Sequence, residues 1–62
     1  MNLGYKIKQL RNERDLSLEK LAQHLNIAKS ILWKYEKDQA IPSAEIIRRI
    51  ASFFNISTDY LL

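Results

Sequence analysis

The chain has 62 residues, no cysteine, 47% hydrophobic residues and a formal net charge of +3 at pH 7. This length allows one small domain, the lack of cysteine excludes a disulfide framework and fits a reducing cytoplasm, and the apolar content excludes a disordered segment. No apolar run approaches the roughly 18 residues of a membrane span, and the polar start MNLGYKIKQ lacks the apolar core of a signal peptide, so we expect a cytoplasmic protein.

The first predicted helix runs from Leu3 to about Asn12. Leu3, Ile7 and Leu10 recur at i, i+4 and i+7, which places them on one face of a helix. We interpret the basic residues of this region as its solvent-exposed side: Lys6, Lys8 and Arg14.

The segment from Leu18 to Lys37 is predicted to form two short helices joined by a tight turn. Apolar residues at i, i+3, i+4 and i+7 form the inner face of the first of these helices: Leu18, Leu21, Ala22 and Leu25. Either Ser17 or Asp15 can cap the free backbone N–H groups at its start. Asn26 then interrupts the pattern, and asparagine tolerates the left-handed conformation that a sharp turn between helices requires.

The second helix of this pair begins near Ala28, and at about 100° per residue its positions divide into two sides. The inner side is apolar, with Ile31 at its margin: Ala28, Leu32 and Tyr35. The outer side carries basic and polar residues with the one tryptophan: Lys29, Ser30, Trp33, Lys34 and Lys37. A surface helix usually has only polar residues on its outer side, so this composition indicates a contact surface, and its positive charge favours an anionic partner.

The rest of the chain predicts two more helices. After the polar loop Lys37–Ala40 and Pro42, the pair Ser43 and Glu45 is typical of a helix start, and the helix ends near Phe54. Its inner positions are Ile47, Ile50, Ala51 and Phe54, while Ile46 and Phe53 lie toward its flank. Asn55 predicts a left-handed end, and Ser57 predicts the cap of a short fifth helix from Thr58 to Leu62.

These segments together resemble the helix-turn-helix proteins of the xenobiotic-response-element family, which includes phage repressors and Cro. The resemblance rests on Ala22, Asn26, Ile27, Leu32 and Tyr35, and it extends to the flanks LGYKIKQLRNERDLS and IPSAEIIRRIASFFNISTDYLL. The ending NISTDYLL is especially similar to immunity repressors of phages and mobile elements in low-GC Gram-positive bacteria. The resemblance implies an all-α, compact five-helix domain over residues 1–62, of the lambda-repressor-like type, with the helix-turn-helix at about residues 18–37.

The same resemblance implies sequence-specific binding to double-stranded DNA by a transcriptional regulator, a repressor that needs no cofactor and places its third helix in the major groove. The positions that face bases are Lys29, Ser30, Trp33 and Lys34; lysine can donate to guanine, and an exposed tryptophan can contact a thymine methyl. The candidates for phosphate contacts are Ser17, Lys37 and Gln39. The family more usually has a small polar residue in place of Trp33, and often a phosphate-binding glutamine in place of Leu18.

Two further contacts are implied by the family. A basic residue of the first helix commonly pairs with an acid at the end of the third, which predicts a partly exposed ion pair between Arg11 and Glu36. A homodimer seam from the last two helices would use Ile46, Phe53, Tyr60 and Leu62. These four side chains can instead simply enlarge the core. A two-fold dimer would place two recognition helices about 34 Å apart on one face of the DNA.

Other functions stay open at the level of sequence. A protein-interaction module, such as an antitoxin or an anti-repressor partner, would use Trp33 and Ile31 against a regulatory protein. The chain is alternatively the N-terminal domain of a longer repressor. An enzyme or a metal protein is not indicated, because His24 is the one histidine and a surface residue by its position, and neither cysteine nor a glycine-rich phosphate loop accompanies it.

Overall fold

The computed structural model describes residues 2–62, and this part of the chain forms five α-helices. In chain order they are α1 (Leu3–Glu13), α2 (Leu18–Leu25), α3 (Lys29–Glu36), α4 (Ala44–Phe54) and α5 (Thr58–Leu61). The predicted all-α fold and helix order are confirmed, with small shifts at helix ends, and residue 1 of the predicted domain lies outside the described residues. None of these helices has the length and apolar character that crossing a membrane requires.

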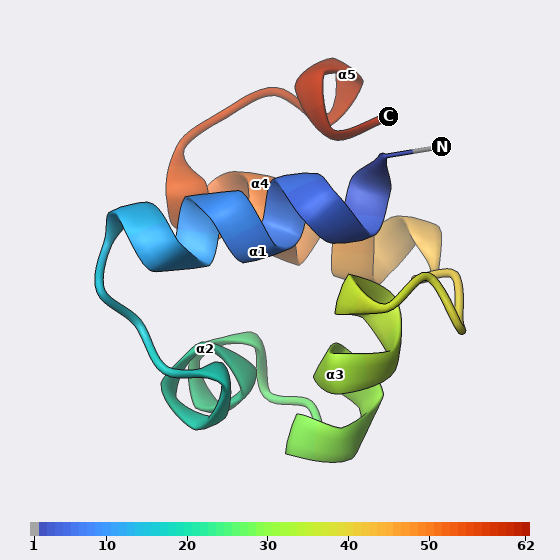
Figure 1. Cartoon of the computed structure of the whole chain (residues 1–62). Coiled ribbons are helices and arrows are strands. Elements are labelled where there is room, and N and C mark those ends of the chain that lie inside the picture. Colours follow the sequence, from blue (N-terminus) through green and yellow to red (C-terminus); the bar gives the residue numbers. More distant parts are fainter. Residues whose placement is uncertain (1) are drawn as a thin grey trace.

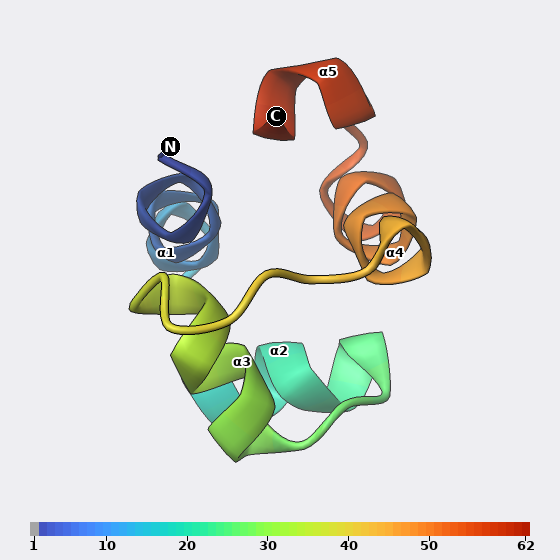
Figure 2. The ribbon, with the colours of Figure 1, turned by 90° about the vertical axis from the view of Figure 1, so that its right-hand side faces the viewer.

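The helices surround a single core. α1 and α4 lie on opposite sides of the molecule, with α5 across one end and the pair α2 and α3 across the other (Figures 1 and 2). α1 packs against α3 and α5, α2 packs against α3 and α4, and α4 packs against α5. The turn between α2 and α3 therefore lies at the end of the molecule that is remote from α5.

The most deeply buried side chains come from every helix: Ile7, Leu21, Leu25, Leu32, Ile50 and Leu61. Burial of one such side chain contributes about 1.5–3 kcal/mol, so the periodic apolar faces explain why these short helices are stable together. One inner position was predicted wrongly, because α3 begins one residue later than expected and leaves Ala28 exposed as its N-cap. In α5 the buried residue is Leu61, whereas Tyr60 and the following Leu62 are exposed.

Serine side chains begin three of the helices as predicted. The Oγ atom of Ser17 accepts a hydrogen bond from the N–H of Lys20 at 3.1 Å. Ser43 and Ser57 cap α4 and α5 in the same way. Each cap satisfies a backbone donor that has no acceptor inside its own helix.

Each of α1 to α4 is followed, within two residues of its end, by a residue with positive φ that is not glycine: Asp15 (53°), Asn26 (58°), Asp38 (57°) and Asn55 (57°). After Asn26, the N–H of Ile27 donates to the carbonyl of Ala22 at 3.0 Å, and the other ends repeat this hydrogen bond. This Schellman arrangement satisfies carbonyl groups at the helix end. The predictions for Asn26 and Asn55 are confirmed, and the structure adds Asp15 and Asp38.

Basic side chains of one helix also reach the carbonyl end of another. Arg14, after α1, donates to the carbonyl of Phe54 at 3.1 Å, and Arg49 of α4 donates to that of Leu25 at 3.0 Å. A cation at a helix C-terminus is favourable because it meets the negative end of the helix dipole. Lys6 donates to the carbonyl of Tyr60 at 2.7 Å. Arg14 is exposed, as expected, and Lys6 is half-buried, but the sequence did not predict the hydrogen bonds that either side chain makes to another helix.

Gly4 lies where the start of α1 meets the end of α3. A Cβ atom at this position would lie 2.5 Å from the carbonyl oxygen of Glu36 and 2.6 Å from that of Tyr35. Only a residue without a side chain allows this approach of two backbones. In the sequence, the glycine itself was the one sign of this contact. Glycine inside a helix is less favourable than alanine by about 1 kcal/mol, so its presence there indicates close packing.

Replacing Gly4 with alanine tests this close approach. We expect Gly4→Ala to lower the free energy of unfolding by about 1–3 kcal/mol, because the added methyl group forces the two helices apart. Urea denaturation followed by circular dichroism measures the change, with Lys8→Ala on the exposed side of α1 as the control. An unchanged or increased stability, as expected for alanine in an unobstructed helix, would contradict the packing argument.

Candidate nucleic-acid interface

The outer side of α3 forms an exposed surface at the edge of the molecule (Figure 1). Leu32 and Tyr35 are buried and fix the opposite side of the helix against the core. The exposed residues are those expected from the sequence: Lys29, Ser30, Trp33, Lys34 and, as the residue that follows the helix, Lys37. We call these five residues the α3 surface.

Trp33 is 43% exposed, so it lies on the α3 surface and not in the core. The Nζ atom of Lys37 lies 6.0 Å from the centroid of its ring, at the outer limit of a cation–π contact. Ile31, predicted at the margin of the inner side, is also exposed. The α3 surface therefore combines positive charge with an apolar group that can pack against another molecule.

The three candidates for phosphate contacts lie just outside α3 or at the start of α2, and all are exposed. Ser17 uses its Oγ atom as an acceptor for the N–H of Lys20, so its hydroxyl hydrogen is still able to donate to an anion. It also stands at the N-terminus of α2, where the helix dipole favours negative charge. In Gln39, the backbone N–H donates to the carbonyl of Lys34 at 2.9 Å, which fixes the loop after α3.

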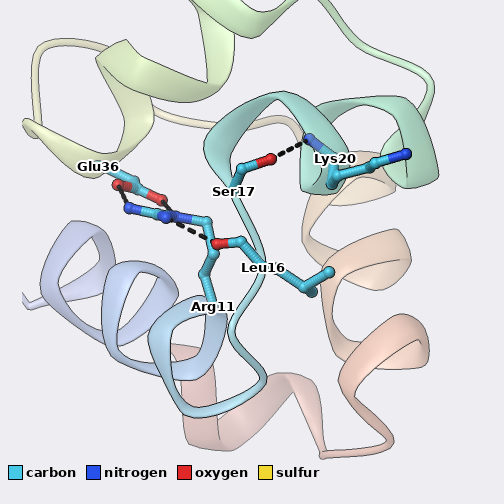
Figure 3. A network of polar contacts seen from close by, with 5 residues as sticks. All are labelled: Arg11, Leu16, Ser17, Lys20 and Glu36. Carbon is cyan, nitrogen blue, oxygen red and sulfur yellow. Dashed lines mark hydrogen bonds and ion pairs between the residues drawn. The ribbon is translucent and has the colours of Figure 1, made fainter.

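Arg11 of α1 connects the two regions that carry these candidates (Figure 3). Its Nε atom lies 2.8 Å from Oε2 of Glu36, its Nη2 lies 3.1 Å from Oε1, and its Nη1 donates to the carbonyl of Leu16 at 2.9 Å. Leu16 precedes Ser17, and Glu36 precedes Lys37. One guanidinium group thus holds the start of α2 and the end of α3 next to each other.

The predicted ion pair between Arg11 and Glu36 is present, and it is only partly exposed, as expected. The two side chains are only 14% and 6% exposed. The pair is bidentate and Arg11 has an additional backbone acceptor, so the charges are well compensated in spite of their burial. Removal of one partner from such a pair leaves the other charge buried without a counter-charge.

The four residues of the predicted dimer seam differ in their burial and surroundings. Ile46 and Phe53 are partly buried and pack against the core. Phe53 lines a depression together with His24 and arginines of α4. Leu62 lines a different, apolar depression of about 360 Å³, whose other residues are Pro42, Ala44, Ile47, Arg48 and Thr58. Tyr60 is exposed on α5.

His24 is exposed, as expected, and its ring packs on that of Phe53 with centroids 4.8 Å apart. Within residues 2–62, histidine, aspartate and glutamate side chains do not gather in groups of three that would suit a metal ion. The features that remain for recognition are those of the α3 surface and its neighbours, which offer hydrogen-bond donors and positive charge. A helix about 10–12 Å in diameter with such an outer side matches the major groove of B-DNA, which is about 12 Å wide.

Comparison with known proteins supports this interpretation. A family model described as a helix-turn-helix domain matches residues 4–62. The HTH-type transcriptional regulator ImmR of Bacillus subtilis (strain 168) is 34% identical over all of this chain and 49% of ImmR. The cryptic phage CTXphi transcriptional repressor RstR of Vibrio cholerae is 35% identical over 82% of this chain and 46% of RstR. The chain thus spans about half the length of these curated relatives.

A solved structure has the same fold. The crystal structure of SinR, the master regulator for biofilm formation, in complex with DNA superposes with a TM-score of 0.87 and 32% sequence identity. The match covers 95% of each chain.

Two ion pairs, one largely buried and one at the surface, provide a matched test of how burial affects the strength of an ion pair. We expect Glu36→Gln to lower the free energy of unfolding by about 1.5–3 kcal/mol, because the buried Arg11 is then without its charged acceptor. The control is Glu45→Gln, since Glu45 pairs with Arg49 at the surface with side chains 62% and 40% exposed, and such pairs contribute about 0–1 kcal/mol. Chemical denaturation of both variants measures the difference; equal destabilisation would mean that burial does not strengthen the interaction of Arg11.

Proposed function

The chain belongs to the helix-turn-helix domain family, and from this membership and the α3 surface we propose that it binds double-stranded DNA in a sequence-specific manner. The family resemblance drawn from the sequence is confirmed. In the proposed complex α3 enters the major groove, and Lys29, Ser30, Trp33 and Lys34 meet base edges. Ser17, Lys37 and Gln39 contact phosphates and fix the orientation of α3.

The observation that carries this proposal is the exposure of Trp33 among the lysines of the α3 surface. Trp33 and the neighbouring Ile31 leave apolar surface exposed on this helix, and the surrounding lysines favour an anionic partner. The major groove of DNA can meet both features of this surface. Thymine offers a methyl group to the apolar side chain, and guanine offers hydrogen-bond acceptors to the lysines.

We further propose that the chain is the DNA-binding part of a transcriptional regulator that acts as a repressor by occupying promoter DNA. The names of RstR and ImmR support a regulatory role, and the share of those proteins that is matched supports a longer regulator with further domains. Action on genomic DNA would place the protein in the bacterial cytoplasm, at the nucleoid.

A protein partner is the alternative occupant of the α3 surface. The exposed pair Ile31 and Trp33 favours it, because aromatic and apolar side chains anchor protein interfaces. Salt distinguishes the two, since DNA binding releases counterions and weakens steeply with salt, whereas an aromatic-anchored interface does not.

The fluorescence of Trp33 tests which partner covers this surface. On addition of mixed-sequence duplex DNA at low salt we expect the exposed emission to change, because the indole moves from water into the groove. Titration with salt is expected to reverse the change steeply. Emission that is indifferent to DNA, together with no mobility shift, would rule out the proposed function.

Single lysine substitutions separate base reading from phosphate binding. With a DNA site selected from a random library, we expect Lys34→Ala to cost about 1–3 kcal/mol and to relax specificity. Lys37→Ala is expected to weaken binding to all sequences and to reduce the salt slope by about 1. The control is Lys8→Ala, which removes an exposed lysine from α1. If all three variants changed binding alike, net charge alone would explain recognition.

We also propose that two copies bind a near-palindromic site, with contact at the apolar depression that Leu62 lines. We expect Leu62→Glu to weaken binding to a complete two-fold site while leaving binding to a single half-site unchanged, because only the first requires contact between copies. Mobility-shift titrations on both DNAs measure this. Full affinity of the variant for the two-fold site would place the dimer contact elsewhere.

A further inference from the structure

Asp38 is an acidic residue in the region proposed to face phosphates. It lies directly between Lys37 and Gln39, at the loop that follows α3. A carboxylate at this position repels the DNA backbone, so by charge alone its removal is expected to strengthen DNA binding. Its hydrogen bonds give the residue a different role.

The carboxylate of Asp38 caps the start of α1. Its Oδ1 atom accepts a hydrogen bond from the N–H of Gly4 at 3.2 Å, although the two residues are 34 positions apart in the chain. Asn2, the N-cap residue of α1, makes no side-chain cap of its own. Gly4 is too close to the start of α1 to donate within the helix, so Asp38 supplies both an acceptor and a negative charge at the positive end of the helix dipole.

Backbone hydrogen bonds fix the loop at the same point. With φ at 57°, Asp38 turns the chain away from α3, and its N–H donates to the carbonyl of Tyr35 at 3.2 Å. The absence of a side chain at Gly4 lets α1 approach the carbonyl groups of Tyr35 and Glu36 directly. The carboxylate therefore attaches the loop to the start of α1 at the place where the chain leaves α3.

From this arrangement, and resting on the proposed DNA binding, we propose that Asp38 is a positioning residue for DNA recognition. Through its hydrogen bond to Gly4 it holds the backbone of Lys37 and Gln39 in the arrangement that contacts phosphates. The carboxylate repels the DNA backbone, but this repulsion is smaller than the gain in binding from holding two phosphate-binding neighbours in place.

A pair of variants separates position from charge. Asp38→Asn removes the charge but keeps a side-chain acceptor and a residue that tolerates positive φ. Asp38→Gly removes the same charge and allows the left-handed turn, but it has no side chain to cap α1. We expect the asparagine variant to bind DNA at least as tightly as the original chain with an unchanged salt slope. The glycine variant is expected to bind more weakly, with a salt slope smaller by about 0.9 for each phosphate that the variant no longer neutralises.

Mobility-shift titrations over a range of salt concentrations, at a temperature where circular dichroism shows each variant folded, measure both quantities. A purely structural role for Asp38 would lower the melting temperature of the glycine variant without changing its salt slope, and that result would overturn the proposal. So would equal or tighter binding by both variants. Failure of the original chain to bind DNA would instead reject the proposed function.

The original chain offers a second test that does not depend on the folding of a variant. Gly4 is the one glycine, so its amide is readily identified in a nitrogen–proton NMR spectrum. If the hydrogen bond to Asp38 prepares the loop for DNA, bound DNA must in turn stabilise that hydrogen bond, because coupling between two equilibria is reciprocal. We expect hydrogen exchange of the Gly4 amide to slow severalfold when DNA is added; unchanged exchange would contradict the proposal.

Discussion

The helix-turn-helix of this protein depends on one largely buried cation, Arg11. The Arg11 guanidinium meets the Glu36 carboxylate through two hydrogen bonds and the Leu16 carbonyl through a third. These acceptors belong to the end of α3 and to the connection before α2, while the cation comes from α1. A planar guanidinium fixes its acceptors in direction as well as distance. The helix that presents Trp33 is therefore held at its carboxyl end by charge and along its length by the burial of Leu32 and Tyr35.

Local patterns predicted the helices and their caps because those features depend on neighbouring residues. Periodicity identified the inner faces, serine identified the helix starts, and the asparagines Asn26 and Asn55 identified two left-handed ends. The roles of Gly4, Arg14 and Asp38 were not predictable in this way, because each meets a part of the chain more than 30 positions away. The hydrogen bond from Arg11 to the Leu16 carbonyl was not predicted either, since the position of a residue on its own helix does not show which backbone groups lie next to it.

In the candidate site, too, features of a single helix were predictable and contacts between helices were not. The angular position of Trp33 on α3 was enough to predict its exposure, because the inner side of that helix is already filled by other apolar residues. The angular positions of Ile46 and Phe53 on α4 were not enough, since α4 packs against both α2 and α5. An apolar residue at the margin of a helix therefore has two explanations, and only the packing of adjacent helices decides between them. The interactions with DNA are inferred from exposure, charge and family membership.

The positive-φ residues at the ends of α1 to α4 also affect the unfolded state of the protein. Glycine would adopt these conformations without steric cost, whereas a residue with a side chain is strained there by about 1–2 kcal/mol, less where Asn or Asp bonds locally. The unfolded chain, however, has more freedom at each glycine, and this freedom opposes folding by about 0.4–1 kcal/mol per position. A chain of 62 residues with one glycine accordingly has a comparatively stiff unfolded ensemble. The side chains at these four positions therefore reduce the conformational entropy that is lost on folding, and this gain offsets part of the backbone strain in the folded state.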